Sequence, residues 1–494
     1  MVWSPFSEYG DPAMNFGQEG VSIYEFDGLY KLDIACQLEI SGFRRISMDN
    51  NSSTHKHAIV IGFSMAGLFT ARVLSDHFEQ VTVIERDPVN DAPESRKGQP
   101  QTIHLHGLLA QGLQIINKYF PGIQQSLVAQ GALEGDMGKV MRWYQFGRFK
   151  VNFGSGLVGM TMTRALLEWQ IRQRVLAIPN VTLRASCAVE ALITSADRSQ
   201  VTGVRIVDRV TGQSEALMAD LIVDASGRGS AAPKWLEGLG YEKPVEEEVK
   251  IRVGYATRMY RRDPKDKFLL MISATPPKGT RGAYLYPVEG DRWILTAGGL
   301  LGDHPPADEA GLLEYVRNVE RPEVYDIISQ AEPLSEIHTY KYPASLRRHY
   351  EKLKRFPEGY LVIGDALASF NPIYGQGMTS GILQAEALDG LLQKQKSLHG
   401  LWRAFFQRAS KVADIPWQLT VGEDFRFPET EGRKSMFTDL LNAYVLKVHL
   451  ATHHDEVVYA QFLRVMNLME PPTSLMSPRI MWRVLLKVRS NSRL

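Results

Sequence analysis

The chain has 494 residues, of which 44% are hydrophobic and 22% charged, enough for two or three domains with sizeable cores. A formal net charge of +1 excludes a strong overall attraction to nucleic acid or to membranes. Two cysteines, Cys36 and Cys187, exclude a disulfide framework and favour the reducing cytoplasm. We expect neither a membrane span nor a secretion signal, because no apolar run has the required length or flanks.

Residues 1–47 are acidic and rich in aromatic residues, and they show no clear periodicity. A short polar segment, residues 48–54, follows them and is of the kind that precedes a first Rossmann strand. We therefore expect translation to begin at Met48, with residues 1–47 as an upstream extension or a mobile arm. The intact mass of the natively expressed protein tests this expectation, and a full-length mass would contradict it.

Residues 58–85 predict a strand, a turn, a helix and a second strand. In the turn, Gly62 permits a tight bend and Gly67 permits close packing of helix on strand. Glu85 ends the second strand, where a carboxylate can hold the ribose hydroxyls of an adenosine. Ser64 stands where the usual fingerprint has its middle glycine. The expected nucleotide contacts here are Gly62, Ser64, Met65, Ala66, Gly67, Glu85 and Arg86.

The same turn also resembles the Gly-x-Ser-x-Gly nucleophile elbow, which would make Ser64 the nucleophile of a serine hydrolase. In hydrolases that elbow normally follows several strands, whereas here it follows the first convincing strand. Glu85 has no role in a hydrolase but is what a nucleotide site needs. The nucleotide site is therefore the favoured interpretation, and the hydrolase stays an alternative.

Two further segments predict cofactor contacts. Arg164 opens a predicted helix, where its charge could neutralise a pyrophosphate or lie in solvent. The apolar strand 219–224 runs into an acidic, glycine-rich turn that contains Asp224 and Gly227. Strands and helices alternate from residue 56 to about 240, which is typical of a doubly wound nucleotide-binding sheet.

Beyond residue 240 the spacing of apolar residues changes to the alternating pattern of β-strands. Alternation from Ile251 to Met259, followed by strands expected at 267–274, 282–287 and 293–297, predicts a mostly antiparallel sheet. This inserted sheet spans residues 241–344, and a helix from about 308 to 319 covers it. The residues expected to line a substrate pocket above it are Tyr255, Met271, Tyr284 and Tyr286.

A buried strand at 360–363 leads to Asp365, whose carboxylate can accept hydrogen bonds from a sugar-like hydroxyl chain. Residues 370–378 then open a helix, and their two glycines let bare backbone approach a flat ring. The helix would aim unpaired N–H groups and its positive dipole end at the ring, stabilising a reduced flavin. An ordinary strand–loop–helix joint is the alternative. The expected flavin contacts are Gly364, Asp365, Pro372, Gly375, Gln376, Gly377 and Met378.

Residues 401–494 are predicted to be helical, and they end in a basic segment without an acid, from Arg479 to Arg493. A solvated basic helix is favoured over one that touches a membrane surface. His104 with His106, and the segment 453–455, lack further ligands at a convincing spacing, so no metal site is predicted.

These motifs, in this order, resemble the FAD-dependent aromatic-hydroxylase-like monooxygenases: GFSMAG with Glu85, the segment 96–101 with His104-Leu105-His106, Arg164, DASGRGS, and GDALASFNPIYGQGM. The resemblance covers about residues 56–480, and its nearest branch looks like the bacterial flavin epoxidases of polyether biosynthesis. It adds Arg96 to the expected cofactor contacts. The chain departs from the family at Ser64 and in the turn after Asp224, which reads Ala-Ser-Gly rather than Asp-Gly. It also lacks the Trp-x-Trp-x-Ile-Pro signature of the flavin halogenases.

The resemblance implies an α/β fold with a glutathione-reductase-type, Rossmann-like FAD-binding domain in residues 56–240 and 345–400. The inserted sheet 241–344 would bind substrate, and 401–494 would be the helical region. It implies an FAD-dependent monooxygenase that transfers one oxygen atom from O2, through a flavin C4a-hydroperoxide, to a small lipophilic olefin or aromatic substrate. Since no second dinucleotide fingerprint occurs, NADH or NADPH is expected to reduce the flavin transiently. A prenyl-type double-bond reductase and a non-catalytic flavoprotein are further alternatives, and no catalytic residue is singled out.

Overall fold

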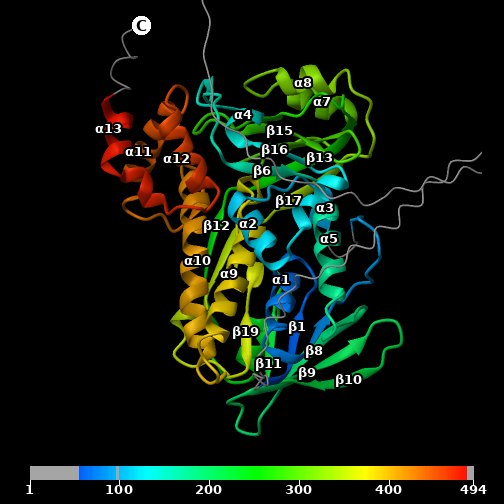
Figure 1. Ribbon diagram of the computed structural model, residues 1–494. Helices are drawn as coiled ribbons and strands as arrows, with labels where there is room; N and C mark the ends of the chain where they lie inside the picture. The colour runs from blue at the N-terminus through cyan, green and yellow to red at the C-terminus, as the bar shows by residue number, and fades with distance from the viewer. Residues whose placement is uncertain (1–54, 96–99, 487–494) are drawn as a thin grey trace, which may run out of the picture. The chain divides into compact units, whose positions relative to one another are not determined.

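A parallel sheet of five strands forms the centre of the computed structural model, which describes residues 55–95 and 100–486 (Figure 1). The sheet order is β19-β11-β1-β2-β7. Its strands are β1 (His55–Ile61), β2 (Phe78–Ile84), β7 (Val181–Arg184), β11 (Leu221–Asp224) and β19 (Tyr360–Val362). From β1 the chain first adds β2 and β7 on one side, and it later adds β11 and β19 on the other side. The strand order therefore reverses beside β1, which makes this position the topological switch point of the sheet. The predicted extension 1–47, the start at Met48 and the contact Arg96 lie outside the described residues.

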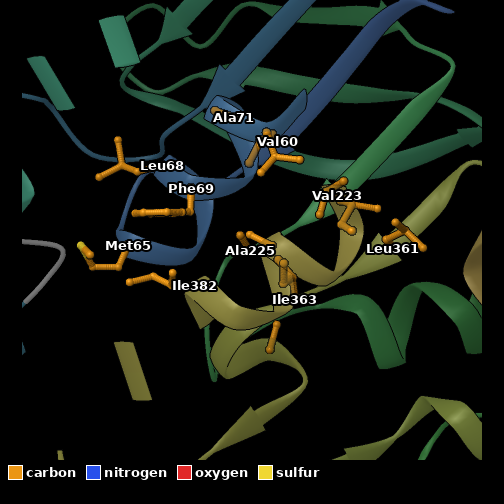
Figure 2. Close-up of a cluster of buried hydrophobic side chains, with 14 of the residues drawn as sticks. Val60, Met65, Leu68, Phe69, Ala71, Val223, Ala225, Leu361, Ile363 and Ile382 are labelled. Carbon is orange, nitrogen blue, oxygen red and sulfur yellow. The ribbon is translucent and has the colours of Figure 1, made fainter. Parts of the chain in front are cut away.

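Helices cover this sheet because its strands are apolar on both faces. They include α1 (Met65–Leu74), α5 (Arg164–Leu176), α9 (Gly377–Leu392) and α10 (Leu401–Asp424), of which α9 packs against both α1 and α10 (Figure 1). Figure 2 shows Leu68 of α1 and Ile382 of α9 in one buried cluster with Val60 and Val223. All four are fully buried, and each contributes roughly 1.5–3 kcal/mol by leaving water.

An antiparallel sheet of three strands adds to the same core. Its order is β10-β9-β8, formed by β8 (Cys187–Thr194), β9 (Val201–Asp208) and β10 (Ser214–Met218). Val204 and Ile206 of β9 belong to the hydrophobic cluster of the parallel sheet. The two sheets therefore share one core.

The inserted sheet has seven strands in the order β17-β13-β16-β15-β14-β4-β5. The predicted strands appear as β13 (Val253–Arg261), β14 (Leu269–Ile272), β15 (Arg281–Val288) and β16 (Arg292–Gly299), followed by β17 (His338–Tyr342). The predicted covering helix is α7 (Glu309–Arg317), and α8 (Glu323–Ile328) follows it. Leu312 and Val316 of α7 pack into the core of this sheet. The fold class predicted from the sequence is thus confirmed.

Two strands of this sheet come from outside the predicted insertion. They are β4 (Met141–Gln145) and β5 (Arg148–Phe149), and β4 pairs in parallel with β14. In β4 the side chains of Met141, Trp143 and Gln145 alternate into the interior. This alternation lets β4 pack on the interior of the sheet while it pairs with β14, so segments distant in sequence build one sheet.

The remaining elements connect these layers. The smaller sheets contain β3 (Leu133–Asp136) with β6 (Val158–Thr161), and β12 (Val245–Lys250) with β18 (Ser345–His349), β20 (Ala368–Ser369) and β21 (Glu431–Gly432). The other helices are α2 (Ala110–Tyr119), α3 (Ile123–Ala129), α4 (Met137–Val140), α6 (Ala232–Gly238), α11 (Thr438–Ala451), α12 (Glu456–Met466) and α13 (Pro478–Leu486). Short 3-10 turns lie at η1 (Pro100–Ile103), η2 (Tyr350–Lys352), η3 (Gly364–Ala366), η4 (Pro372–Tyr374) and η5 (Pro472–Met476). Within the described ranges, no helix combines the length and the apolar character needed to cross a membrane.

Candidate functional site

The turn between β1 and α1 is tight. Gly62 has a positive φ of 102°, and its N–H donates to the carbonyl of Ile84 at 2.8 Å. A Cβ atom on Gly67 would lie 2.0 Å from the carbonyl oxygen of Gly62, so this residue must be glycine for α1 to pack on the turn. The first amides of α1 consequently point out beyond the carboxyl end of β1, where they can bind an anion.

Glu85 lies directly after β2, at the same edge of the sheet. Its side chain is 7% exposed and accepts hydrogen bonds from the backbone N–H groups of Phe63 and Asp87, both at 3.1 Å. These bonds hold the carboxylate beside the turn. A carboxylate has about four acceptor positions, so Glu85 can also accept from vicinal hydroxyls.

Arg164 is the first residue of α5 and belongs to a nearly buried polar cluster. Its guanidinium donates to Glu168 at 2.8 Å, to the Ser64 hydroxyl at 2.9 Å and to Nε2 of His106 at 2.9 Å. Because arginine only donates, Nε2 of His106 accepts, and the Nδ1 proton of that ring is donated to the His104 carbonyl at 2.9 Å. Burial, aided by the charge of Arg164, holds the pKa of His106 well below its usual value. His106 is therefore neutral, with both ring nitrogens engaged.

The same contacts weigh against Ser64 as a nucleophile. Its backbone is in the ordinary extended conformation, with φ of −104°, rather than the strained conformation of a nucleophile elbow. Its hydroxyl donates to Glu168 at 2.9 Å and accepts from Arg164. A serine nucleophile usually has a histidine as its general base, whereas this hydroxyl contacts Glu168, whose carboxylate is paired with Arg164 and is therefore a weak base.

Gly364 and Asp365 follow β19. Gly364 has a positive φ of 68°, and a Cβ atom here would lie 2.7 Å from Cβ of Ala66, so the end of β19 lies against α1. One carboxylate oxygen of Asp365 lies close to the bare backbone of Gly377, 3.8 Å from where a Cβ would stand. Asp365 is exposed and lines the larger cavity described below. Desolvation by the surrounding protein raises the pKa of its carboxyl, against the charges of Arg164 and Arg228.

Asp424, the last residue of α10, forms hydrogen bonds to residues at both ends of the turn η4. One Asp424 oxygen accepts from the side-chain amide of Asn371 at 2.9 Å and from the hydroxyl of Tyr374 at 3.0 Å. These partners lie on either side of Pro372, so a single carboxyl fixes both ends of the turn. Gly375, with φ of 68°, then leads into α9.

Burial of Asp424 makes its protonation unusual. The side chain is fully buried, and desolvation raises the pKa of the carboxyl to about 7, although the bonds from Asn371 and Tyr374 oppose this rise. The second oxygen, Oδ2, has no partner among the described residues. A protonated carboxyl is therefore the form that suits this site at and below neutral pH.

Asp424→Asn should change how stability depends on pH. In the wild type the unfolded carboxyl ionises near pH 4 while the folded one stays protonated to about pH 7, so native stability falls as pH rises between these values. The variant lacks this loss, and its stability relative to wild type should rise by on the order of 3 kcal/mol across that range. Urea unfolding at several pH values measures the difference. Asp76→Asn, which removes a half-exposed carboxylate paired with Arg72, is the control and should show no such trend.

Two cavities meet at this edge of the parallel sheet. The larger has a volume of about 570 Å³. The predicted contacts that line it are Gly62, Ser64, Met65, Ala66, Glu85, Arg86, Arg164, Gly227, Gly364, Asp365, Pro372, Gly375, Gln376, Gly377 and Met378. The fold thus brings together residues spread over more than 300 positions in sequence. It also adds wall residues that sequence reasoning missed, which include His106, Gly107, Trp235, Tyr340 and Tyr342.

Two predicted contacts within the described residues do not line the cavity. Gly67 lies behind the turn, where it has the packing role predicted for it. Asp224 is fully buried, and its carboxylate accepts from Ser226, Ser230 and Tyr360. Asp224 therefore holds the turn that carries Gly227, and the buried position of its strand end keeps it away from the cavity.

The smaller cavity has a volume of about 180 Å³ and lies between the inserted sheet and η4. All four residues predicted for the substrate pocket, Tyr255, Met271, Tyr284 and Tyr286, are in its wall. Most of the other wall residues are also apolar, among them Met137, Met141, Trp143, Met160, Leu269, Leu463 and Met466. The two cavities share His106, Gly107, Tyr255, Pro372 and Gly375. The two cavities are therefore adjacent at these residues.

Solved structures share this architecture. The flavin-dependent brominase Bmp2 matches with a TM-score of 0.61 and 15% identity, covering 89% of this chain and 100% of the other. PqsL of Pseudomonas aeruginosa, described as a probable FAD-dependent monooxygenase, matches with a TM-score of 0.57 and 17% identity, covering 76% and 99%. At such identities the likeness concerns the fold alone. No family model matches the sequence.

The parallel sheet, the inserted sheet and the C-terminal helices match the fold of solved FAD-dependent monooxygenases and halogenases. One relative found by sequence shows the family to which the chain belongs. Protein Rv3254 of Mycobacterium tuberculosis is 35% identical over 390 residues, which cover 75% of this chain and 80% of the relative. The chain belongs to the family of Protein Rv3254.

Proposed function

We propose that the protein is an FAD-dependent monooxygenase that adds one oxygen atom from O2 to a small lipophilic substrate, by epoxidation or hydroxylation. The observation that carries the proposal is the meeting of the two cavities at Pro372 and Gly375. A large cavity with nucleotide-type contacts adjoins a small apolar one there. An olefin or an aromatic ring suits the apolar walls.

The residues of the larger cavity fit FAD. Glu85 offers acceptors for the ribose, the start of α1 offers amides for the pyrophosphate, and Asp365 offers acceptors for the ribityl chain. Gln376 precedes α9 and is 1% exposed, and its side-chain amide has no partner among the described residues. Such an orphaned amide beside bare glycine backbone indicates a wall built around a further polar group.

The protein's part in the reaction is positioning and exclusion of water. When bound, reduced FAD would react with O2 and supply the oxygen atom for transfer. Pro372 and Gly375 would hold the substrate against the cofactor, and the apolar wall would exclude water. His106 borders both cavities, but its engaged ring nitrogens offer the substrate no proton.

Further details belong to the same proposal. NADH or NADPH would reduce the cofactor transiently, and the free, buried thiol of Cys187 suits a cytoplasmic protein. Residues 56–240 with 345–400 would form the FAD-binding domain, and 241–344, together with β4 and β5, would form the substrate domain. The nearest chemistry would be that of the polyether-type flavin epoxidases.

The first experiment is the visible absorption spectrum of the purified protein, followed by that of the supernatant after heat denaturation. Flavin bands that are released by heating would support non-covalent FAD. A colourless protein that also refuses added FAD would contradict the proposal. Labelling of Ser64 by a fluorophosphonate probe would then favour the serine hydrolase instead.

Oxygen uptake separates the proposed monooxygenase from a double-bond reductase. With NAD(P)H and a panel of olefins and aromatic compounds, a monooxygenase should consume O2 and give a product heavier by one oxygen atom. A prenyl-type reductase should consume no O2 and give a product heavier by two hydrogen atoms. If the flavin-loaded protein neither oxygenates nor reduces any compound of the panel, the assignment of a lipophilic olefin or aromatic substrate is contradicted.

A further inference from the structure

Exposed large apolar side chains are concentrated in the C-terminal part of the described chain. Fourteen large apolar side chains are exposed in the described residues, and eight of them lie between Met436 and Leu485. The eight are Met436, Phe437, Leu440, Leu441, Met476, Met481, Trp482 and Leu485. We call them the C-terminal apolar surface. Such a concentration is a mark of an interaction site, whereas single exposed apolar residues elsewhere need no explanation.

Five of the eight residues lie on the helices α11 and α13, and the other three lie next to these helices in the sequence. In α13, Ile480 and Val484 point into a hydrophobic core, whereas Met481, Trp482 and Leu485 are exposed on the other side. In α11, Val448 and Ala451 join that same core, while Leu440 and Leu441 of its first turn stay outside.

The two helices are neighbours. α11 packs against α13, and Tyr444 of α11 donates to the carbonyl of Leu475 at 2.6 Å, just before α13 begins (Figure 1). The surface is therefore carried by one packed unit.

This region is richer in basic than in acidic residues. Among its described residues, from Arg433 to Leu486, there are six lysines and arginines against four acids, and three more basic residues follow in the sequence. Two of the acids are already paired with basic groups: Asp439 with Lys434, and the buried Asp455 with Arg483. Arg479 is exposed on α13, and Lys447 on α11.

We propose that the C-terminal apolar surface docks the protein on an anionic lipid membrane, in the manner of an interfacial protein and without spanning it. Aromatic, leucine and methionine side chains would enter the boundary between headgroups and acyl chains, while the surrounding basic residues would meet anionic headgroups. A second copy of the chain fits less well, because the excess of basic residues would bring like charges together across the interface. The proposal does not rest on the proposed flavin chemistry.

Vesicle sedimentation tests the proposal with the full chain. The protein should sediment with vesicles of equal parts phosphatidylcholine and phosphatidylglycerol, more weakly with phosphatidylcholine alone, and less as salt rises. The double variant Phe437→Ser/Trp482→Ser should partition at least about tenfold less well. Val210→Ser is the matched control, because Val210 is 81% exposed on the turn between β9 and β10. It should bind like the wild type.

Several results would overturn the proposal: no sedimentation with anionic vesicles, equal binding of the double variant, or equal loss in the control. Sedimentation velocity without lipid adds an independent readout. A wild-type dimer that the double variant converts to a monomer, together with no vesicle binding, would assign the surface to a second copy. Because no flavin, reductant or substrate enters these measurements, their outcome is independent of the absorption spectrum that tests the function.

Discussion

Gly67→Ala should destabilise the protein by about 3 kcal/mol or more and abolish the FAD binding proposed above. The new Cβ would lie 2.0 Å from the carbonyl oxygen of Gly62 and 2.8 Å from its carbonyl carbon. Neither atom can move freely, since the N–H of Gly62 is bonded to the end of β2. The amino end of α1 would have to withdraw from the sheet, and its amides would leave the cavity. Thermal unfolding and flavin content after purification measure both effects.

Gly238→Ala is the matched control for this change. Gly238 ends α6, and a Cβ atom at that position would meet open space. The control should therefore unfold at the wild-type temperature and bind the same amount of flavin. A Gly67→Ala protein that also behaved like the wild type would mean that α1 and the turn are not packed as described.

Asp365→Ala should weaken FAD binding by about ten- to a hundredfold, because a hydrogen bond to a charged group contributes about 1.5–3 kcal/mol. The carboxylate lies at the wall of the larger cavity, beside the backbone of Gly377. Titration of the apoprotein with FAD, followed by flavin fluorescence, measures the affinity. Asp365→Asn keeps one acceptor oxygen and should lose less.

Folding and binding can be separated in this variant. Asp365 is exposed at the wall of the larger cavity, so its carboxylate should contribute little to the stability of the apoprotein. Removing it should leave the unfolding temperature of the apoprotein unchanged. Asp76→Ala, at a half-exposed position away from the cavity, should leave FAD affinity unchanged. Unaltered FAD affinity in Asp365→Ala would remove this residue from the proposed ribityl site.

Most of the large cavity can be located from the amino-acid sequence, because the features that build it are local. Gly62 and Gly67 are required by the geometry of one turn, and Glu85 and Asp365 follow directly from where strands end. Parallel strands bring such ends to one edge, so residues far apart in sequence can be grouped from their motifs alone. The period change near residue 250 likewise marks the inserted sheet correctly.

Features that depend on packing between distant segments could not be predicted. No local pattern shows that Asp424 reaches Asn371 and Tyr374, or that β4 joins the inserted sheet. For Asp224 the pattern indicates only that the carboxylate ends a strand, whereas its direction depends on Ser226 and Ser230. At the C-terminus the sequence favours a solvated basic helix, since it does not tell which apolar side chains of α11 and α13 stay outside the core.

The contact between α10 and η4 determines where the chain can be truncated without loss of structure. The helical region begins beyond residue 400, yet its first long helix supplies Asp424 to the turn that borders both cavities. Phe405 and Phe406 of the same helix are buried in the core of the parallel sheet. A fragment that ended near residue 400 would therefore lack part of the hydrophobic core of the parallel sheet. It would also lack the hydrogen bonds from η4 to Asp424. The parallel sheet and α10 therefore share one hydrophobic core, and we expect them to unfold together rather than as separate domains.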